Sequence, residues 1–181
     1  MNPTMPLAFR ENYCDTCTIV DCMEVFTEQP SAAECQSETF SSYKYNNTAK
    51  GLISIAPSGQ ITFISDLYAG RCSDKKIMRH CGLYDILESG DSVMADKGFD
   101  IEVDLKHISC SLTILPFLEA HSQFTEQQLE HTINIAAVRV HVERGVWKIK
   151  NFQILLHTVP ISLCNPYRVY GESDWLIHVS R

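Results

Sequence analysis

The stretch CTIVDCMEVF (residues 17–26) consists mainly of apolar and β-branched residues, and Asp21 interrupts it in the middle. This composition predicts a mostly buried β-strand. A carboxylate within a buried strand is costly unless a partner stabilises its charge. The stretch therefore predicts both a core strand of a sheet and a polar site within that strand.

Two further apolar runs follow in GLISIAPSGQITFISDL (residues 51–67), separated by the turn-forming triplet Pro57-Ser58-Gly59. This pattern predicts a β-hairpin. The preceding segment, residues 28–48, is rich in Ser, Asn and Thr and predicts a polar loop that carries Lys44.

A helix is predicted to begin at Ser73 or Asp74, either of which can cap it, and to end near Leu87. The segment DSVMAD (residues 91–96) then predicts a short buried strand that ends at Asp96, because Lys97-Gly98 breaks the pattern.

Residues 100–107 fit a helix or a strand equally well, and CSLTILPF (residues 110–117) predicts a fifth strand. Thr125 and Gln128 form a capping box for a long helix that ends near Asn151. Glu143 lies on the apolar stripe of that helix, where a carboxylate is unexpected.

These elements predict one α/β domain, in which the first and fourth strands lie side by side in a mixed sheet. Asp21 and Asp96 would then be neighbours, and the last helix could present Glu143 to the same place. Clustered carboxylates without sulfur or imidazole favour Mg²⁺ or Mn²⁺. Two such ions catalyse phosphodiester cleavage.

Each acid also has a structural explanation. Glu143 is four residues after Arg139 and adjacent to Arg144, which allows an ion pair on the helix surface. Asp96 could open a turn, and Asp21 could cap a neighbouring element. The residue pattern alone leaves both interpretations open.

The chain has 181 residues, 45% hydrophobic content and a net charge of −7. No run of eighteen apolar residues and no secretory signal are present, which predicts an intracellular protein outside the membrane. The eight cysteines are predicted to be reduced, and the pair Cys14 and Cys17 lacks the second pair that a zinc site needs. The acidic charge disfavours nucleic acid unless basic groups gather on one face.

Five blocks occur in the order IVDCMEVF, SSYKYNNT, ISDLYAGRCSD, SVMADKGFD and RVHVERGVWKIKNF. They resemble the DDE superfamily endonuclease domain of Harbinger-like transposases, including the form found behind THAP zinc fingers. The resemblance implies a ribonuclease-H-like fold, with a mixed five-stranded sheet flanked by helices. It divides the chain into an N-terminal extension (1–16), the endonuclease domain (17–163) and a divergent tail (164–181).

The same resemblance assigns catalysis and metal binding to Asp21, Asp96 and Glu143, with Mg²⁺ or Mn²⁺ as the cofactor. Asp74 is a rival second ligand, which we interpret as a helix cap. Lys44 and Arg144 are the basic residues that we expect to contact DNA phosphates.

The implied activity is metal-dependent DNA cleavage in the nucleus. DNA is the implied partner, and a homodimer and a DNA-binding domain on another segment or partner protein remain open. The alternative is a catalytically inactive, domesticated or truncated transposase-derived binding module.

Overall fold

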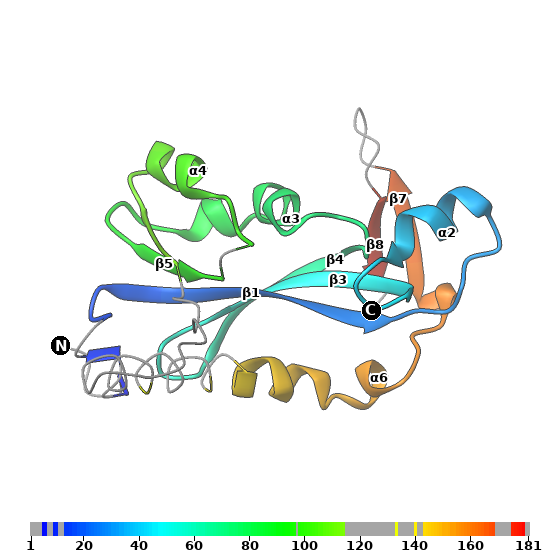
Figure 1. The fold of residues 1–181 in the computed structure, drawn as a ribbon, viewed down its shortest axis with the longest axis horizontal. Helices are drawn as coiled ribbons and strands as arrows, with labels where there is room; N and C mark the ends of the chain where they lie inside the picture. Colours follow the sequence, from blue (N-terminus) through cyan, green and yellow to red (C-terminus); the bar gives the residue numbers. More distant parts are fainter. Residues whose placement is uncertain are drawn as a thin grey trace, which may run out of the picture.

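The computed structural model describes residues 5–6, 9–10, 13–96, 98–114, 133, 140, 143–168 and 175–179. It contains one mixed β-sheet between two helical layers (Figure 1). Helices α3 (Asp74–His80) and α4 (Glu102–His107) lie over one face. The helical stretch 143–150 and α6 (Gln153–Leu156) lie over the other. This arrangement confirms the predicted α/β class and is compatible with a ribonuclease-H-like fold.

The sheet is built around its first strand. Its strands are β1 (Thr16–Phe26), β2 (Phe40–Ser41), β3 (Asn46–Ile55), β4 (Ile61–Ala69), β5 (Ser92–Ala95), β6 (Ser111–Ile114), β7 (Cys164–Arg168) and β8 (Trp175–Val179). The order is β6-β5-β1-β3-β4-β8-β7, and β2 pairs with β3. β1 is parallel to β5 and antiparallel to β3, as the predicted mixed sheet requires. The predicted tail contributes β7 and β8, which continue the sheet beyond β4.

The segment predicted as a polar loop contains a helix, α2 (Ala33–Thr39), so that prediction was wrong there. The Asn47 side-chain amide donates to Thr39 Oγ1 at 2.7 Å and to the Gln36 carbonyl at 3.1 Å. The Gln36 amide in turn donates to the Pro30 carbonyl at 2.8 Å. These tertiary hydrogen bonds stabilise the short helix. The helix was missed because the segment has no apolar periodicity that would predict it.

The helix predicted from Ser73 to Leu87 is divided in two. Ser73 Oγ accepts from the Lys76 N–H at 3.3 Å, so Ser73 is the N-cap and the interpretation of Asp74 as the cap was wrong. Gly82 has a left-handed φ of 81°, which separates α3 from a 3₁₀ helix (Leu83–Ile86). A second 3₁₀ helix spans Ile161–Leu163.

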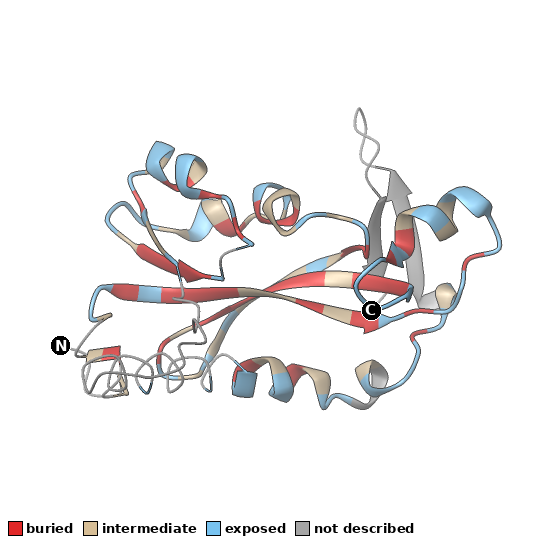
Figure 2. Cartoon of the chain, in the orientation of Figure 1, coloured by how far each residue is buried: buried red, intermediate tan, exposed pale blue. Residues whose placement is uncertain are grey.

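Each face of the sheet has its own core (Figure 2). On one face, Val20 and Leu52 pack in a cluster with Ile77 of α3 and Leu105 of α4. On the other face, the helical stretch 143–150 packs on the sheet through the cluster Met23, Ile53, Ile55 and Ile149. β1 is therefore covered on both sides, and any polar side chain at its centre is drawn away from bulk water.

Two structural expectations concern membranes and thiols. Among the described residues, no helix combines the length and apolarity needed to cross a membrane. The seven cysteines whose side chains are described are free thiols. The predicted capping box at Thr125 and Gln128 lies outside the described residues.

Gly70 allows the end of β4 to approach neighbouring backbone closely. Its N–H donates to the Thr48 carbonyl at 3.0 Å, and an added Cβ would lie 2.7 Å from the Thr39 carbonyl oxygen. We expect Gly70→Ala to lower the free energy of unfolding by about 1–3 kcal/mol, because backbone must move to admit the methyl group. Urea unfolding measures the change.

The matched control for this prediction is Gly98→Ala. A Cβ at Gly98 would meet nothing within 4 Å, and its φ is outside the left-handed range. The control is expected to leave stability unchanged or slightly raised. Equal destabilisation by both substitutions would contradict the close-approach explanation for Gly70.

Candidate metal centre

Asp21 and Asp96 are placed together by the pairing of β1 with β5. The parallel register matches Ile19 with Met94 and Val20 with Ala95, so Asp21 follows the last register pair on β1 and Asp96 follows it just beyond the end of β5. Side chains alternate between faces along a strand. Ile19 and Met94 share one core cluster, so Asp21 lies on that face, and Asp96 follows β5 close enough for its charge to raise the pKa of Asp21. The predicted neighbour relation of these two residues follows from this register.

The Asp21 carboxylate is largely withdrawn from water. Its pKa is raised from 3.8 to about 6, and burial is the largest cause. The negative charges of Asp74 and Asp96 contribute to this increase, whereas the hydrogen bond from the Cys22 N–H at 2.8 Å and the charge of Lys150 oppose it. The ionised form of Asp21 therefore lacks full compensation within the protein, and a bound cation would stabilise it.

Asp96 directly follows β5, which ends at Ala95, one residue before the predicted end of this strand. Its side chain is exposed, and its carbonyl accepts from the Phe99 N–H at 3.0 Å in the turn beyond the strand. A carboxylate at this edge can reach both solvent and its neighbour on β1. This position suits a ligand that shares an ion with Asp21 and leaves room for water.

Glu143 begins the described helical stretch that covers the face of Asp21. Two residues later, a Cβ at Gly145 would collide with the Ile55 side chain, so the helix lies close against β3. Glu143 and Lys150 are seven residues apart and share one side of the helix. Lys150 acts electrostatically on Asp21, while Glu143 is exposed about two turns away.

The structure thus brings two of the three predicted acids side by side and the helix of the third onto the same face. Within the described part of the chain, no group of three His, Cys, Asp or Glu side chains is arranged to hold a metal ion. The assignment of Glu143 as the third ligand stays a prediction. The two aspartates are hard oxygen donors, which fit Mg²⁺ or Mn²⁺.

Asp74, the rival second ligand, belongs to a different charge cluster. Its carboxylate accepts from Lys50 Nζ at 3.1 Å, and Glu24 lies 3.6 Å from the same nitrogen. Burial disfavours the Lys50 cation, but Asp74 and Glu24 outweigh burial and raise the pKa of Lys50. We call Lys50, Asp74 and Glu24 the ion-paired cluster.

The ion-paired cluster lies toward the α3 face of the sheet, whereas Asp21 shares its face with Met94 and the last helix. The charge of Asp74 still raises the pKa of Asp21 more than that of exposed Asp96 does, because water screens a half-buried charge less. Asp74 already has Lys50 as its counter-ion. Asp74 lies toward the other face of the sheet and is already paired with Lys50, so we favour Asp96 as the residue that would share a metal ion with Asp21.

Our sequence analysis missed Lys50 and Glu24, although a signal was present. The two residues are paired across β1 and β3 in the antiparallel register, and each interrupts a strand that is otherwise largely buried. Opposite charges directly across two strands favour an ion pair. Because the hairpin and β1 are far apart in sequence, the pairing emerges only once the register is known.

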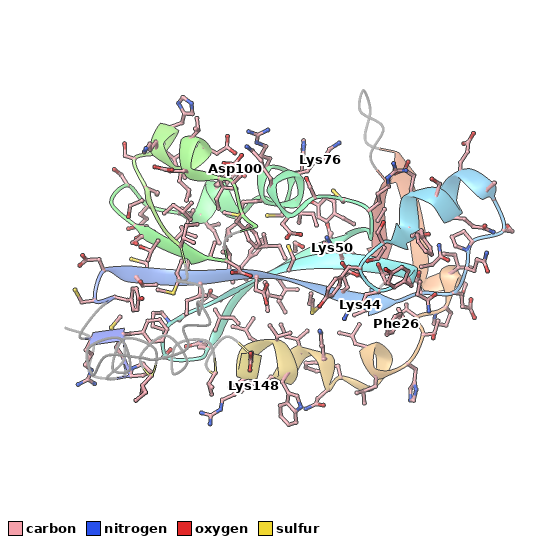
Figure 3. All side chains as sticks on the ribbon, viewed as in Figure 1. Phe26, Lys44, Lys50, Lys76, Asp100 and Lys148 are labelled. Carbon is pink, nitrogen blue, oxygen red and sulfur yellow. The ribbon has the colours of Figure 1, made fainter. Side chains whose placement is uncertain are left out.

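The predicted phosphate contacts lie in separate places. Lys44 is exposed in the turn between β2 and β3, with Nζ 4.9 Å from the ring centroid of Tyr43. Arg144 is exposed on the helical stretch that also carries Lys148. Lys44 and Lys148 lie apart in Figure 3, one at the Phe26 end of the sheet and one beneath it. The two predicted contacts therefore lie on different elements, Lys44 in the turn and Arg144 on the helical stretch.

Comparison with known protein families identifies the family of the chain. A sequence model of the family described as DDE superfamily endonuclease matches residues 20–171, which is most of the chain. No curated protein and no solved structure matches the chain significantly. The matched range includes Asp21, Asp96 and Glu143.

The raised pKa of Asp21 predicts that its ionisation lowers the free energy of unfolding of the metal-free protein. Its pKa is 3.8 when unperturbed and about 6 in the folded state, so the folded chain binds more protons between these values. The contribution of Asp21 to stability is then most favourable below about pH 4 and becomes less favourable as pH rises to about 6. We expect Asp21→Asn to raise the free energy of unfolding at pH 7 by up to about 3 kcal/mol in chelator.

Urea unfolding from pH 4 to pH 8 tests this, and the advantage of Asp21→Asn should shrink toward pH 4. Asp15→Asn removes an exposed carboxylate and serves as the control, with an expected change below about 0.5 kcal/mol. A destabilising effect of Asp21→Asn at pH 7 would show that the protein itself fully compensates this charge.

Proposed function

Since the chain belongs to the DDE superfamily endonucleases, we propose that it cleaves DNA with Mg²⁺ or Mn²⁺ held by Asp21, Asp96 and Glu143. The observation that supports this proposal is the β1–β5 register, whose last pair, Val20 and Ala95, immediately precedes the two aspartates. One or two carboxylates suffice to hold Mg²⁺ together with water and phosphate oxygens. Glu143 would complete the set from the helix that covers the face of Asp21.

Ions bound there would activate the attacking oxygen and stabilise the leaving oxygen of the phosphodiester. The ionised form of Asp21 is the one that can act as a ligand, so protons and cations compete for it. Lys150 lowers the pKa of Asp21 and thereby favours the ligand form. The ion-paired cluster holds the first turn of α3 against β3, which keeps the opposite face of the sheet in place.

The finer identity that we propose is a Harbinger-like transposase-derived nuclease that acts on DNA in the nucleus. The net charge is −7, and an acidic surface repels phosphates. We therefore propose that part of the affinity for DNA comes from outside this domain. A DNA-binding domain on another segment, a partner protein or a second copy of the chain would supply it.

A second candidate function is a transposase-derived binding module that lacks catalysis. The specific observation in its favour is that the described residues contain no group of three metal-ligating side chains, with Glu143 exposed on its helix. Such a module would bind DNA or protein equally well with the acids replaced. The two candidates therefore differ in their dependence on Asp96 and on divalent metal.

Plasmid nicking in Mg²⁺ or Mn²⁺, with chelator as the blank, tests the catalytic proposal. We expect Asp96→Asn and Glu143→Gln each to lower the nicking rate beyond the roughly 10–100-fold loss typical of groups outside the metal's ligand sphere. Asp74→Asn is the matched control and should lose less, because Asp74 pairs with Lys50. Nicking that persists in Asp96→Asn would contradict the assignment of Asp96 as a metal ligand.

Metal binding can be measured without DNA. Mn²⁺ should raise the melting temperature of the wild-type protein, because a ligand that binds only the folded state stabilises it. The increase should be absent in Asp96→Asn and present in Asp74→Asn. An equal increase in both variants would place the metal elsewhere.

Lys44 and Arg144 are proposed to contact DNA phosphates. Each of Lys44→Ala and Arg144→Ala should weaken binding for all sequences and reduce the slope of log K against log salt by about 0.9. Equilibrium titrations at several salt concentrations measure the slope. Lys106→Ala, which removes a cation already paired with Glu102 on α4, is the control and should leave the slope unchanged.

A further inference from the structure

A hollow of about 720 Å³ opens beside α2 and the turn between β2 and β3. Its lining combines aromatic rings, side-chain amides, hydroxyls and a guanidinium, contributed among others by Phe40, Tyr45, Gln36, Asn46, Ser37 and Arg71. Acids outnumber bases in the chain by 22 to 15. Even so, none of the described residues that line the hollow is acidic. The hollow therefore lacks the carboxylates that would repel an anionic ligand, and its amides and hydroxyls can hydrogen-bond with polar groups of a ligand.

The inner wall of the hollow is held in place by hydrogen bonds. Asn47, which is buried, donates from its side-chain amide to the Gln36 carbonyl and to Thr39 Oγ1. Gln36 donates onward to the Pro30 carbonyl. These contacts fix α2 against the start of β3, so the hollow is a preformed feature of the fold.

The mouth of the hollow presents side-chain groups that take no part in the hydrogen bonds between α2 and β3. Tyr45 is 83% exposed and adopts φ of 52°, a left-handed conformation that costs energy for a bulky side chain. Asn46 Oδ1 accepts from the Asn47 N–H at 2.8 Å, and its amide nitrogen retains two donors. Arg71 uses one guanidinium N–H on Ser37 Oγ at 3.2 Å and has others to offer.

We propose that this hollow binds an unpaired nucleobase of the DNA substrate. The proposal rests on the proposed function. The Tyr45 and Phe40 rings provide faces on which a base can stack, and the Asn46 amide can hydrogen-bond with a base edge. Arg71 supplies the positive charge that the adjoining phosphate requires. The volume lies within the range of small-molecule sites, which suits a single nucleotide.

The hollow is separate from the candidate metal centre. Asp21 pairs with Ile53 on β3, and Asn47 lies six residues earlier on the same strand. At ~3.3 Å per strand residue, the separation is about 20 Å. This corresponds to roughly six stacked nucleotides at 3.4 Å each. The hollow would therefore hold a base at a distance from the scissile phosphate and set the register of the cut.

The test compares two DNA duplexes that differ in one group: one carries a single extrahelical base and the other an abasic residue at the same bulge. Fluorescence anisotropy in chelator and at fixed salt reports binding without cleavage. The wild-type protein should prefer the extrahelical base roughly tenfold, as expected for one stacked base. Equal binding of the two duplexes, or no measurable binding, would overturn the proposal.

Substitutions at Tyr45 locate the effect. Tyr45→Asn removes the ring but tolerates the left-handed backbone, so it should abolish the preference without unfolding the chain. Tyr45→Phe retains the ring and should keep the preference. Tyr43→Asn removes a ring that is 80% exposed and does not line the hollow, and it is the matched control. Preference retained in Tyr45→Asn, or lost equally in Tyr43→Asn, would contradict the assignment.

The outcomes separate this inference from the proposed nuclease activity. Metal-dependent nicking without a preference for the extrahelical base would remove the hollow as a binding site and leave the nuclease proposal standing. A Tyr45-dependent preference without nicking would support the hollow and favour the non-catalytic module. Thermal melting of each variant confirms that the compared proteins are folded.

Discussion

The candidate metal centre depends on a carboxylate at the centre of β1, a strand that is packed on both faces. β1 pairs on both edges and is packed on both faces, so Asp21 is held where its charge is poorly solvated. The parallel pairing with β5 adds a second carboxylate beside it. A sheet optimised for stability alone would place an apolar residue here, because an uncompensated charge in such a place is costly. The protein retains a local destabilisation that a cation would relieve.

The acidic residues on the two faces of the sheet differ in how far their negative charge is compensated. On the α3 face, Asp74 and Glu24 share the Lys50 cation within 3.1 and 3.6 Å, so negative charge is offset inside the protein. On the opposite face, Lys150 acts on Asp21 from the helix but does not bring its pKa back to the ordinary range. This contrast identifies the face with unsatisfied negative charge, which is the face where an external cation gains most.

Local patterns predicted the parts of the structure that are locally determined. β1, the hairpin and the end of β5 just before Asp96 follow from apolar runs and from turn residues such as Gly59, whose φ is 82°. Helix α2 and the role of Asp74 could not be predicted in the same way, because both depend on side chains brought in by β3. The pairing of Asp21 with Asp96 required only strand order, whereas the reach of Glu143 depends on how its helix packs.

The acidic surface also has a consequence for how DNA would be held. Two divalent ions would bring four positive charges to a site with three carboxylates, so the sign of the local charge reverses when the ions bind. Affinity for DNA near the metal centre would then depend on metal. Away from that centre, the hollow beside α2 offers stacking and hydrogen bonds in surroundings without acidic lining among the described residues. Contacts of that kind depend less on phosphate attraction, which an overall charge of −7 opposes.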